Sequence, residues 1–584
     1  MLLPVLFFFT ALGAGKVIAG PGSGSSGFQN PILPGFHPDP SCIFVPEEDD
    51  TFFCASSSFN AFPGIPIHAS RDLKTWRLIS NALNRPNQLP ELAYSNGSTS
   101  GIWAPALRYR DGTFYLVTTN VHDKYAQEDP TRWDNIIFQT DDIYDDDSWT
   151  DAVHFNFTGY DTSPFWDDDG TAYIVGSHAY RVEPGIHLNK VDLKTGELKG
   201  EWTNLWNGTG GLAPEGPHIY RKDGYYYLLV AEGGTGLGHM ETIARSKNLY
   251  GPYDANPANP ILSNANTTEY FQTVGHADLF QDKKGNWWGV ALSTRSGPDY
   301  ITYPMGRETV MYNVTWEAGK WPVCEQVRGN MKGWQLPKSN KKIPEDGKLV
   351  DEGDHDIDFA PGSKLPSHFL HWRPPVGKDT YTVSSKGHPY TLRLKPSKFN
   401  LTGLDGNYGD PAGGQTFVGR RQVDTLFTYK VNLEYSPKTI EEEAGVTLFL
   451  TQNHHARVGI VLLPMSNSSK TLTPHFRFHA ISNVPVPASF STPLPHSWTN
   501  KKLTMQIHTN NQTHFTFSAG LASGSKKEMK DLAVVPGSIV SWGFTGSLVG
   551  VYATANGGEG KTEAYVSNWS YKGEGQVREN CAKC

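Results

Sequence analysis

The N-terminal half of the chain repeats one pattern five times. Each unit opens with a short polar motif and reaches, roughly a dozen residues later, a charged or glycine-containing turn followed by aromatic residues. The units recur roughly every fifty to sixty residues, which is too long for a helical solenoid and suits a four-stranded propeller blade. The openers are HPDPS (37–41), WAPAL (103–107), DTSPF (161–165), APEGPH (213–218) and GHADL (275–279).

Three of these openers carry an acidic residue, namely Asp39, Asp161 and Glu215. If each opener begins the innermost strand of a blade, the three carboxyl groups converge on one axis. Carboxyl groups gathered in a pocket are what hydrolysis of a glycosidic bond requires. Inversion uses one ionised carboxylate to deprotonate water and one protonated carboxyl to protonate the leaving oxygen, and a further like charge can keep the acid protonated.

The local sequence around two of these acids is unusual for surface charges. Asp39 lies between two prolines, which stiffen its backbone, although an Asp in an ordinary turn is the alternative interpretation of that tetrapeptide. Glu215 lies between proline and glycine, directly before an apolar strand. The neighbouring acidic run 167–169 is typical of a solvated turn and is given no chemical role.

The N-terminus and the composition indicate a secretory protein. Residues 1–19 resemble a signal peptide without the usual positive charge, and 20–27 form a Gly/Ser/Pro-rich flexible leader. Nine glycosylation sequons support this route; they begin at Asn96, Asn156, Asn207, Asn266, Asn313, Asn400, Asn467, Asn511 and Asn568. We therefore expect a secreted, extracellular glycoprotein that does not span a membrane. The net charge of −8 without a basic cluster argues against a nucleic-acid partner.

The five cysteines suggest one disulfide. Cys42 and Cys54 flank a polar turn on strands expected to be adjacent, so a disulfide is favoured over two free buried thiols. Cys581 and Cys584 have the spacing of half a zinc site, but no second pair of cysteines matches them, and Cys324 leaves the number odd.

The repeated pattern of openers and turns ends before residue 336, where the composition changes. We expect a propeller over 28–335, a charged and Pro/Gly-rich linker over 336–354, and a second all-β domain over 355–584. Short apolar runs at 392–394, 426–433, 445–450, 458–463, 503–508 and 514–518 have the spacing of a β-sandwich. The predicted fold class is all-β, with no amphipathic helix of useful length.

The chain resembles glycoside hydrolase family 43 over nearly its whole length after the leader. The resemblance rests on stretches that occur in family order, among them NPILPGFHPDPS (30–41), GIWAPAL (101–107), YDTSPFWDDDG (160–170), PEGPHIY (214–220), GHAD (275–278) and GRET (306–309). It implies a five-bladed propeller, an inverting mechanism and three acids. By position, Asp39 would be the general base, Asp161 the acid that tunes the pKa and orients the site, and Glu215 the general acid.

The resemblance also implies substrate-binding residues. Arg307 would bind sugar hydroxyls, and Phe59 and Trp103 would form apolar walls of the sugar site. His276 matches a histidine near the propeller axis that orients water, substrate or an ion in relatives. No cofactor is required; a structural calcium or sodium ion at the axis is compatible with the resemblance, although no acidic ligand cluster indicates one. Two positions differ from the family pattern and could reshape the pocket: Tyr160 beside Asp161, and the pair 240–241.

The expected function is a secreted glycosidase acting on arabinoxylan or xylo-oligosaccharides. Release of L-arabinofuranose side chains is favoured over exo-acting β-1,4-xylosidase action, because an extracellular enzyme meets the branched polymer; one site could accept both pentoses. A non-catalytic carbohydrate-binding propeller is a different class of function, and the complete set of three acids argues against it. A retaining β-fructosidase-type propeller enzyme would need a nucleophile in a different opening motif, which the sequence lacks.

Overall fold

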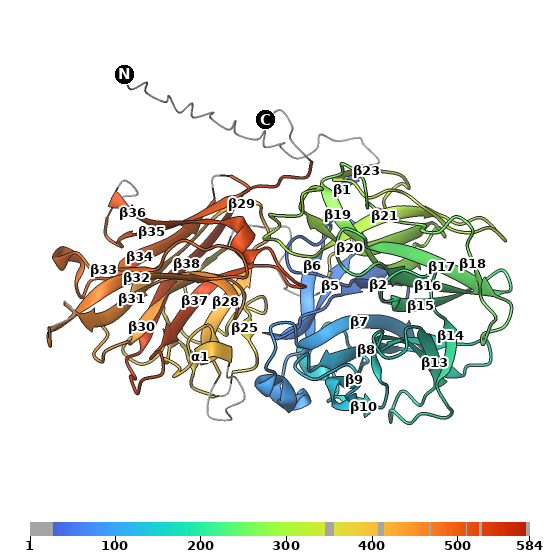
Figure 1. The fold of residues 1–584 in the computed structure, drawn as a ribbon, viewed down its shortest axis with the longest axis horizontal. Coiled ribbons are helices and arrows are strands. Elements are labelled where there is room, and N and C mark those ends of the chain that lie inside the picture. Colours follow the sequence, from blue (N-terminus) through green and yellow to red (C-terminus); the bar gives the residue numbers. More distant parts are fainter. Residues whose placement is uncertain are drawn as a thin grey trace, which may run out of the picture.

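The computed structural model describes residues 27–344, 355–375, 377–406, 414–465, 469–509, 511–524 and 528–579. Figure 1 shows two bodies side by side, one blue to green and one yellow to red. The predicted signal peptide, nearly all of the leader, most of the predicted linker, Cys581 and Cys584 lie outside the described residues. Gly27, assigned to the leader, already begins strand β1 (Gly27–Gln29), which pairs with β23 (Asn330–Lys332).

The N-terminal body contains five four-stranded antiparallel sheets, each built from strands consecutive in the chain except for the small β4 (Ala61–Phe62). The first two sheets hold β2 (Ser41–Val45), β3 (Thr51–Ala55), β5 (Gly64–Ser70), β6 (Arg77–Leu83), and β7 (Gly101–Arg110), β8 (Thr113–Val121), β9 (Trp133–Thr140), β10 (Val153–Phe155). The next two hold β11 (Gly159–Trp166), β12 (Ala172–His178), β13 (Ile186–Lys190), β14 (Thr203–Trp206), and β15 (Glu215–Lys222), β16 (Tyr225–Glu232), β17 (Met240–Ser246), β18 (Asp254–Ala255). The last holds β19 (Phe271–Gln281), β20 (Trp287–Arg295), β21 (Glu308–Thr315), β22 (Val323–Cys324).

The first strands of the five sheets contact one another in a closed order, β2 to β7, β11, β15, β19 and back to β2. Each sequence opener lies in, or directly before, one of these strands. Every opener contains a residue with positive φ inside or next to its strand: Asp39 (51°), Ala104 (37°), Asp161 (53°), Gly216 (59°) and His276 (54°); Ala213 (49°) is a second one in its opener. Four of the five strands also shift register there, as β-bulges do, and bulges are used to redirect side chains. The repeat therefore encodes five similar bends that face one common centre.

A buried polar network joins the five first strands. Asp278 of β19 accepts hydrogen bonds from Ser41 of β2 at 2.7 Å and from Arg108 of β7 at 2.8 Å. Arg108 also contacts His218 of β15, which contacts Ser163 of β11, both at 2.9 Å. Burial raises the pKa of Asp278, but the charges of Arg108 and His218, together with hydrogen bonds from Arg108 and Tyr220, outweigh burial and bring that pKa to about 2. An ionised pair thus holds together strands that come from all five sheets.

The C-terminal body is a β-sandwich, as predicted. One sheet contains β24 (His355–Ile357), β26 (Tyr381–Val383), β27 (Leu392–Leu394), β29 (Leu426–Glu434), β34 (Leu503–His508), β35 (His514–Leu521), β36 (Lys530–Pro536) and β38 (Ala564–Gly575). The other contains β28 (Thr416–Arg421), β30 (Glu443–Thr451), β31 (His454–Pro464), β32 (Leu472–Ile481), β33 (Phe490–Pro493) and β37 (Leu548–Thr554). A shared apolar core fills the space between them. The one α-helix of the described residues, α1 (Gly403–Gly406), has four residues.

The two bodies pack against each other through an apolar interface. Strand β25 (His371–Trp372) pairs with β4 of the N-terminal body. One buried cluster contains Phe36 and Phe59 of that body together with Trp372, Phe417 and Phe449 of the sandwich side. At Gly306 a Cβ atom would lie 2.0 Å from the Thr545 carbonyl oxygen, so the sandwich approaches the GRET loop at backbone contact distance.

Two further expectations concern the cysteines and membranes. Cys42 and Cys54 face each other on β2 and β3 and form a disulfide, as predicted. Cys324 is a free cysteine. Among the residues that the structure describes, no helix is long and apolar enough to cross a bilayer.

Candidate active site

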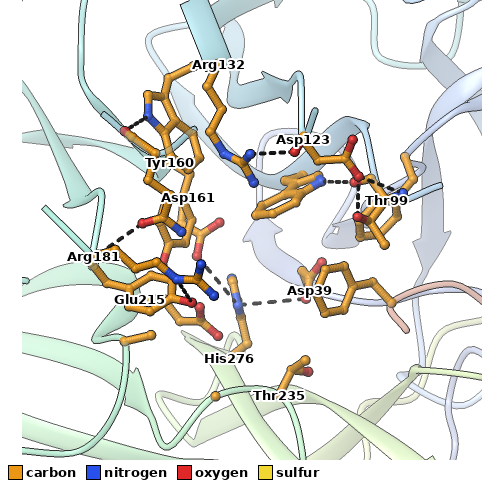
Figure 2. Close-up of a pocket in the computed structure, with 18 of the residues that line it drawn as sticks. Asp39, Thr99, Asp123, Arg132, Tyr160, Asp161, Arg181, Glu215, Thr235 and His276 are labelled. Atoms are coloured by element: carbon orange, nitrogen blue, oxygen red, sulfur yellow. Dashed lines mark hydrogen bonds and ion pairs between the residues drawn. The ribbon is translucent and has the colours of Figure 1, made fainter. Parts of the chain in front are cut away.

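The eight residues proposed from the sequence for catalysis and binding all line one cavity of about 540 Å³. They are Asp39, Phe59, Trp103, Tyr160, Asp161, Glu215, His276 and Arg307. The cavity lies at the end of the first strands, where the five bends meet. Figure 2 shows Asp39 on one side, Asp161 and Glu215 on the other, and His276 between them.

Asp39 is held by charge and by a hydroxyl group. Arg307 approaches with both terminal nitrogens: Nη1 is 3.0 Å from Oδ1, and Nη2 donates to Oδ2 at 3.2 Å. Ser57 Oγ donates to Oδ2 at 2.6 Å. The Asp39 side chain is 4% exposed and that of Arg307 7%, so the pair is largely withdrawn from solvent. A buried guanidinium stabilises an ionised carboxylate, the form that a general base needs.

Glu215 has the opposite electrostatic setting. Burial is the largest cause that raises its pKa, and the charge of Asp39 adds to it; Arg307 and a hydrogen bond with Tyr160 act in the other direction. The resulting pKa is about 7. A carboxyl group with such a pKa is still protonated in a substantial fraction near neutral pH, as a general acid must be.

Asp161 and His276 connect the two sides of the site. Burial, then the charges of Glu215 and Asp39, raise the pKa of Asp161 well above its usual range. Its Oδ2 accepts the Gly216 amide at 3.1 Å, so Asp161 contacts the backbone directly after Glu215. His276 Nδ1 lies 3.8 Å from Asp39 Oδ1 and 3.9 Å from Asp161 Oδ2.

Aromatic rings form the walls of the cavity. The Trp103 ring lies 6.1 Å from Phe59 and 5.8 Å from Tyr160, measured between centroids. Tyr160 in turn stacks on Trp133 at 5.3 Å. The predicted effect of Tyr160 on the pocket therefore has a structural basis, because its ring forms part of the wall.

One wall residue comes from the other body and was not among the residues predicted from the sequence. Phe544 of the sandwich lies 5.9 Å from Phe59 and 5.7 Å from Trp103, and its carbonyl accepts a hydrogen bond from Arg307 Nε at 2.9 Å. No local motif marks Phe544, and it is far from the openers in sequence.

Other lining residues were also missed. Thr235 accepts a hydrogen bond from Arg307 Nη1 at 3.1 Å, and its GGT segment was the available signal. Arg132 and Arg181 line the cavity together with the aromatic residues Tyr125 and Tyr180. Residues 240–241, which differ from the family pattern, do not line the cavity. Glu241 is buried and accepts a hydrogen bond from the Ala277 amide at 2.8 Å.

A second, very small cavity of about 10 Å³ lies beneath the site, lined by Asp39, Asp161, His218 and His276 among others. That volume is about what one water needs. The residues that the structure describes contain no group of three or more His, Cys, Asp or Glu side chains that could hold a metal ion.

The chain matches known proteins over both bodies. The family model of "Glycosyl hydrolases family 43" matches residues 28–322, and that of "Beta xylosidase C-terminal Concanavalin A-like domain" matches residues 356–572. The non-reducing end alpha-L-arabinofuranosidase BoGH43B of Bacteroides ovatus is 32% identical over 548 residues, covering 91% of this chain and 92% of that protein. Xylosidase/arabinosidase 43B of Humicola insolens is 33% identical over 429 residues, covering 72% and 74%.

Solved structures agree with this assignment. The crystal structure of a xylan beta-1,4-xylosidase from Bacillus halodurans C-125 superposes with a TM-score of 0.79 at 28% identity, covering 93% of this chain and 100% of that one. Similarity to known proteins thus extends over both the N-terminal body and the C-terminal sandwich. The chain belongs to glycosyl hydrolases family 43 and is a glycosidase.

Proposed function

We propose that this glycosidase is an inverting enzyme that releases L-arabinofuranose side chains from arabinoxylan. The observation that carries the mechanism is the unequal setting of the two carboxyls, with Asp39 paired to Arg307 and Glu215 buried with a pKa of about 7. We further propose that the five sheets are the five blades of a propeller whose axis runs through the cavity.

In the proposed reaction the Asp39 carboxylate takes a proton from a water molecule. Asp39 Oδ1 accepts no well-formed hydrogen bond from the described residues, which makes it the oxygen suited to this task. The water oxygen forms a bond to the anomeric carbon as the bond to the leaving oxygen breaks, and Glu215 gives its proton to that oxygen. One attack from the side opposite the leaving group inverts the anomeric configuration.

The remaining cavity residues would position the sugar and the two acids. Asp161 modulates the pKa of Glu215 and holds the Gly216 amide, so it acts on the backbone that carries the acid. Arg307 and His276 orient Asp39 and contact sugar hydroxyls, while Phe59, Trp103 and Tyr160 enclose the apolar face of the pentose.

The substrate assignment is supported by the names of relatives. The Bacteroides ovatus relative is described as an arabinofuranosidase, and the Humicola insolens relative as a xylosidase/arabinosidase. The second candidate activity is exo-acting β-1,4-xylosidase, which the Bacillus halodurans neighbour's title favours. Both activities use a pocket for one pentose, and the aromatic walls suit either sugar.

Two measurements on the reaction products test this proposal. Proton NMR of the first product, recorded before mutarotation, is expected to show the inverted anomer; retention would exclude Asp39 as a base. Chromatography is expected to give arabinose in excess over xylose from arabinoxylan, and little xylose from linear xylo-oligosaccharides, which contain no arabinose. Xylose as the main product from both would transfer the assignment to β-xylosidase. A Glu215→Gln variant serves as the control for contaminating activities.

We also propose that the protein is secreted and glycosylated. A structural calcium or sodium ion at the axis would have no catalytic role. Sequons at exposed positions would carry glycans, whereas Asn313 is 9% exposed and donates to the Lys332 carbonyl at 2.8 Å, so we expect it to stay unmodified. Mass spectrometry of the secreted protein before and after deglycosylation tests the site assignment. No catalytic step requires an ion.

A further inference from the structure

A histidine outside the set of predicted residues lies directly behind the proposed general acid. His239 precedes β17, and its side chain is fully buried. Its ring packs on Gly275 of the GHAD opener, where a Cβ atom would lie 2.7 Å from three ring atoms. Any larger residue at position 275 would displace the ring, so β19 is built to admit it.

The protonation state of His239 follows from its partners. Nδ1 lies 3.0 Å from the carbonyl oxygen of Thr273. A carbonyl oxygen can only accept, so Nδ1 carries the hydrogen. Burial lowers the pKa of His239 to about 3, which keeps the ring neutral. Nε2 therefore has a lone pair and no hydrogen, and it is buried without a hydrogen-bond partner among the described residues.

This lone pair faces the acid. His239 Nε2 lies 3.7 Å from Glu215 Oε1. A neutral ring with the hydrogen on Nδ1 cannot donate to an ionised Glu215, but it can accept from a protonated one. The distance is longer than a hydrogen bond, and such contacts tighten in substrate complexes. We propose that His239 is a positioning residue that favours the protonated form of Glu215 and orients its carboxyl through the unprotonated Nε2.

Other charged groups also face this pair and act on its protonation. Glu215 is influenced by Asp39, Arg307 and Tyr160, and it interacts with Asp161 and with Glu241. His239 is influenced by His276, Arg307 and Asp39. His239 differs from these groups because the Thr273 carbonyl holds its ring and leaves Nε2 as a hydrogen-bond acceptor toward Glu215. The inference rests on the proposed role of Glu215 as general acid.

The matched substitution is His239→Asn. The asparagine amide can occupy the position of Nδ1 and keep the bond to Thr273, while the Nε2 acceptor is lost and water can enter. We expect the basic limb of the kcat/KM profile, measured with an alkyl pentoside, to move down by about one pH unit, the size of one buried neutral hydrogen bond. Ser263→Ala is the control, because Ser263 Oγ donates to the His239 carbonyl at 2.9 Å without contacting the ring. Its profile should not move.

A spectroscopic readout tests the same point without activity. In protein labelled with ¹⁵N-histidine, assigned by comparison with His239→Asn, the Nε2 resonance of His239 is expected to be that of an unprotonated nitrogen and to shift as Glu215 ionises. In Glu215→Gln, whose amide can donate permanently, the shift with pH should disappear. A protonated Nε2, or a pH profile of His239→Asn equal to that of wild type, would overturn the inference. Full activity of Glu215→Gln on alkyl pentosides would instead overturn the proposed function.

Discussion

Arg307 forms a two-point ion pair with Asp39, with Nη1 3.0 Å from Oδ1 and Nη2 donating to Oδ2 at 3.2 Å. The same guanidinium donates from Nε to the Phe544 carbonyl at 2.9 Å. One side chain thus connects the proposed base to the loop of the sandwich that closes the cavity. The geometry uses all three guanidinium nitrogens, which a lysine could not reproduce.

Two substitutions of Arg307 should distinguish the effect of its positive charge from that of its hydrogen-bonding geometry. Arg307→Met is expected to lower kcat/KM by roughly 10²-fold or more, because the buried carboxylate of Asp39 loses its partner. Arg307→Lys keeps the positive charge but cannot contact Asp39 through two nitrogens, so its kcat/KM should lie between those of wild type and Arg307→Met. Steady-state kinetics with thermal unfolding as a control for folding would check this. Equal activity of all three proteins would contradict the assigned role.

The two carboxyl groups proposed for catalysis, Asp39 and Glu215, should respond differently to the leaving group. Glu215→Ala is expected to lose roughly 10²–10⁴-fold on natural glycosides and to keep part of its activity on aryl glycosides whose leaving group needs no proton. Asp39→Ala should be inactive on both, with azide restoring activity by acting as an external nucleophile or base. The comparison uses kcat/KM on an oligosaccharide and on an activated aryl pentoside. An equal loss of activity on both substrates would remove Glu215 from the role of acid.

The pKa of Glu215 sets the upper end of the pH range. Its pKa is raised to about 7, and the protonated form is the active one, so activity should be present below this value and lost as the pH rises through it. The profile of kcat/KM on a poor leaving group should show a basic limb near pH 7. A limb that persists unchanged in Glu215→Gln would have to belong to another group.

Asp161 should affect both turnover and the pH profile. Asp161→Asn is expected to lower kcat strongly without unfolding the protein, since the amide is isosteric. It should also change the pH profile, because the charge of Glu215 raises the pKa of Asp161 and the amide removes this second titrating carboxyl group from the site. Circular dichroism provides the folding control. A profile identical to that of wild type would show that Asp161 acts by another route.

The sandwich should be part of the sugar site rather than a separate module. Phe544→Ala removes a ring that contacts Phe59 and Trp103, and is expected to raise KM for short substrates about tenfold, the effect of one apolar side chain on binding. Leu532→Ala, at a residue that packs against the sandwich core, provides a control for general destabilisation. Removal of the chain after about residue 340 should damage the enzyme, because it exposes the apolar interface around Phe36 and Trp372. A soluble, fully active truncated protein would contradict both expectations.

Much of the site could be predicted because its residues lie in repeated local motifs. Each opener combines a strand with a bend, and both are properties of a short stretch of sequence. The repeat therefore places Asp39 and Asp161 at the bend residue of their openers and Glu215 directly before that of its own, Gly216. The sandwich strands were also predictable from alternating apolar residues, and the Cys42–Cys54 pair from its position across a turn.

The strands, the two bodies and the choice of the three acids as candidates could be predicted from the sequence, because these depend on local pattern and composition. Only the folded chain shows that Phe544 lines the pocket and that His239 Nε2 faces Glu215 while its Nδ1 is bound to the Thr273 carbonyl. Both depend on contacts between segments distant in sequence, and no local propensity encodes such contacts. The same holds for the pKa of Glu215, since burial and the charge of Asp39 exist only once the chain has closed around them.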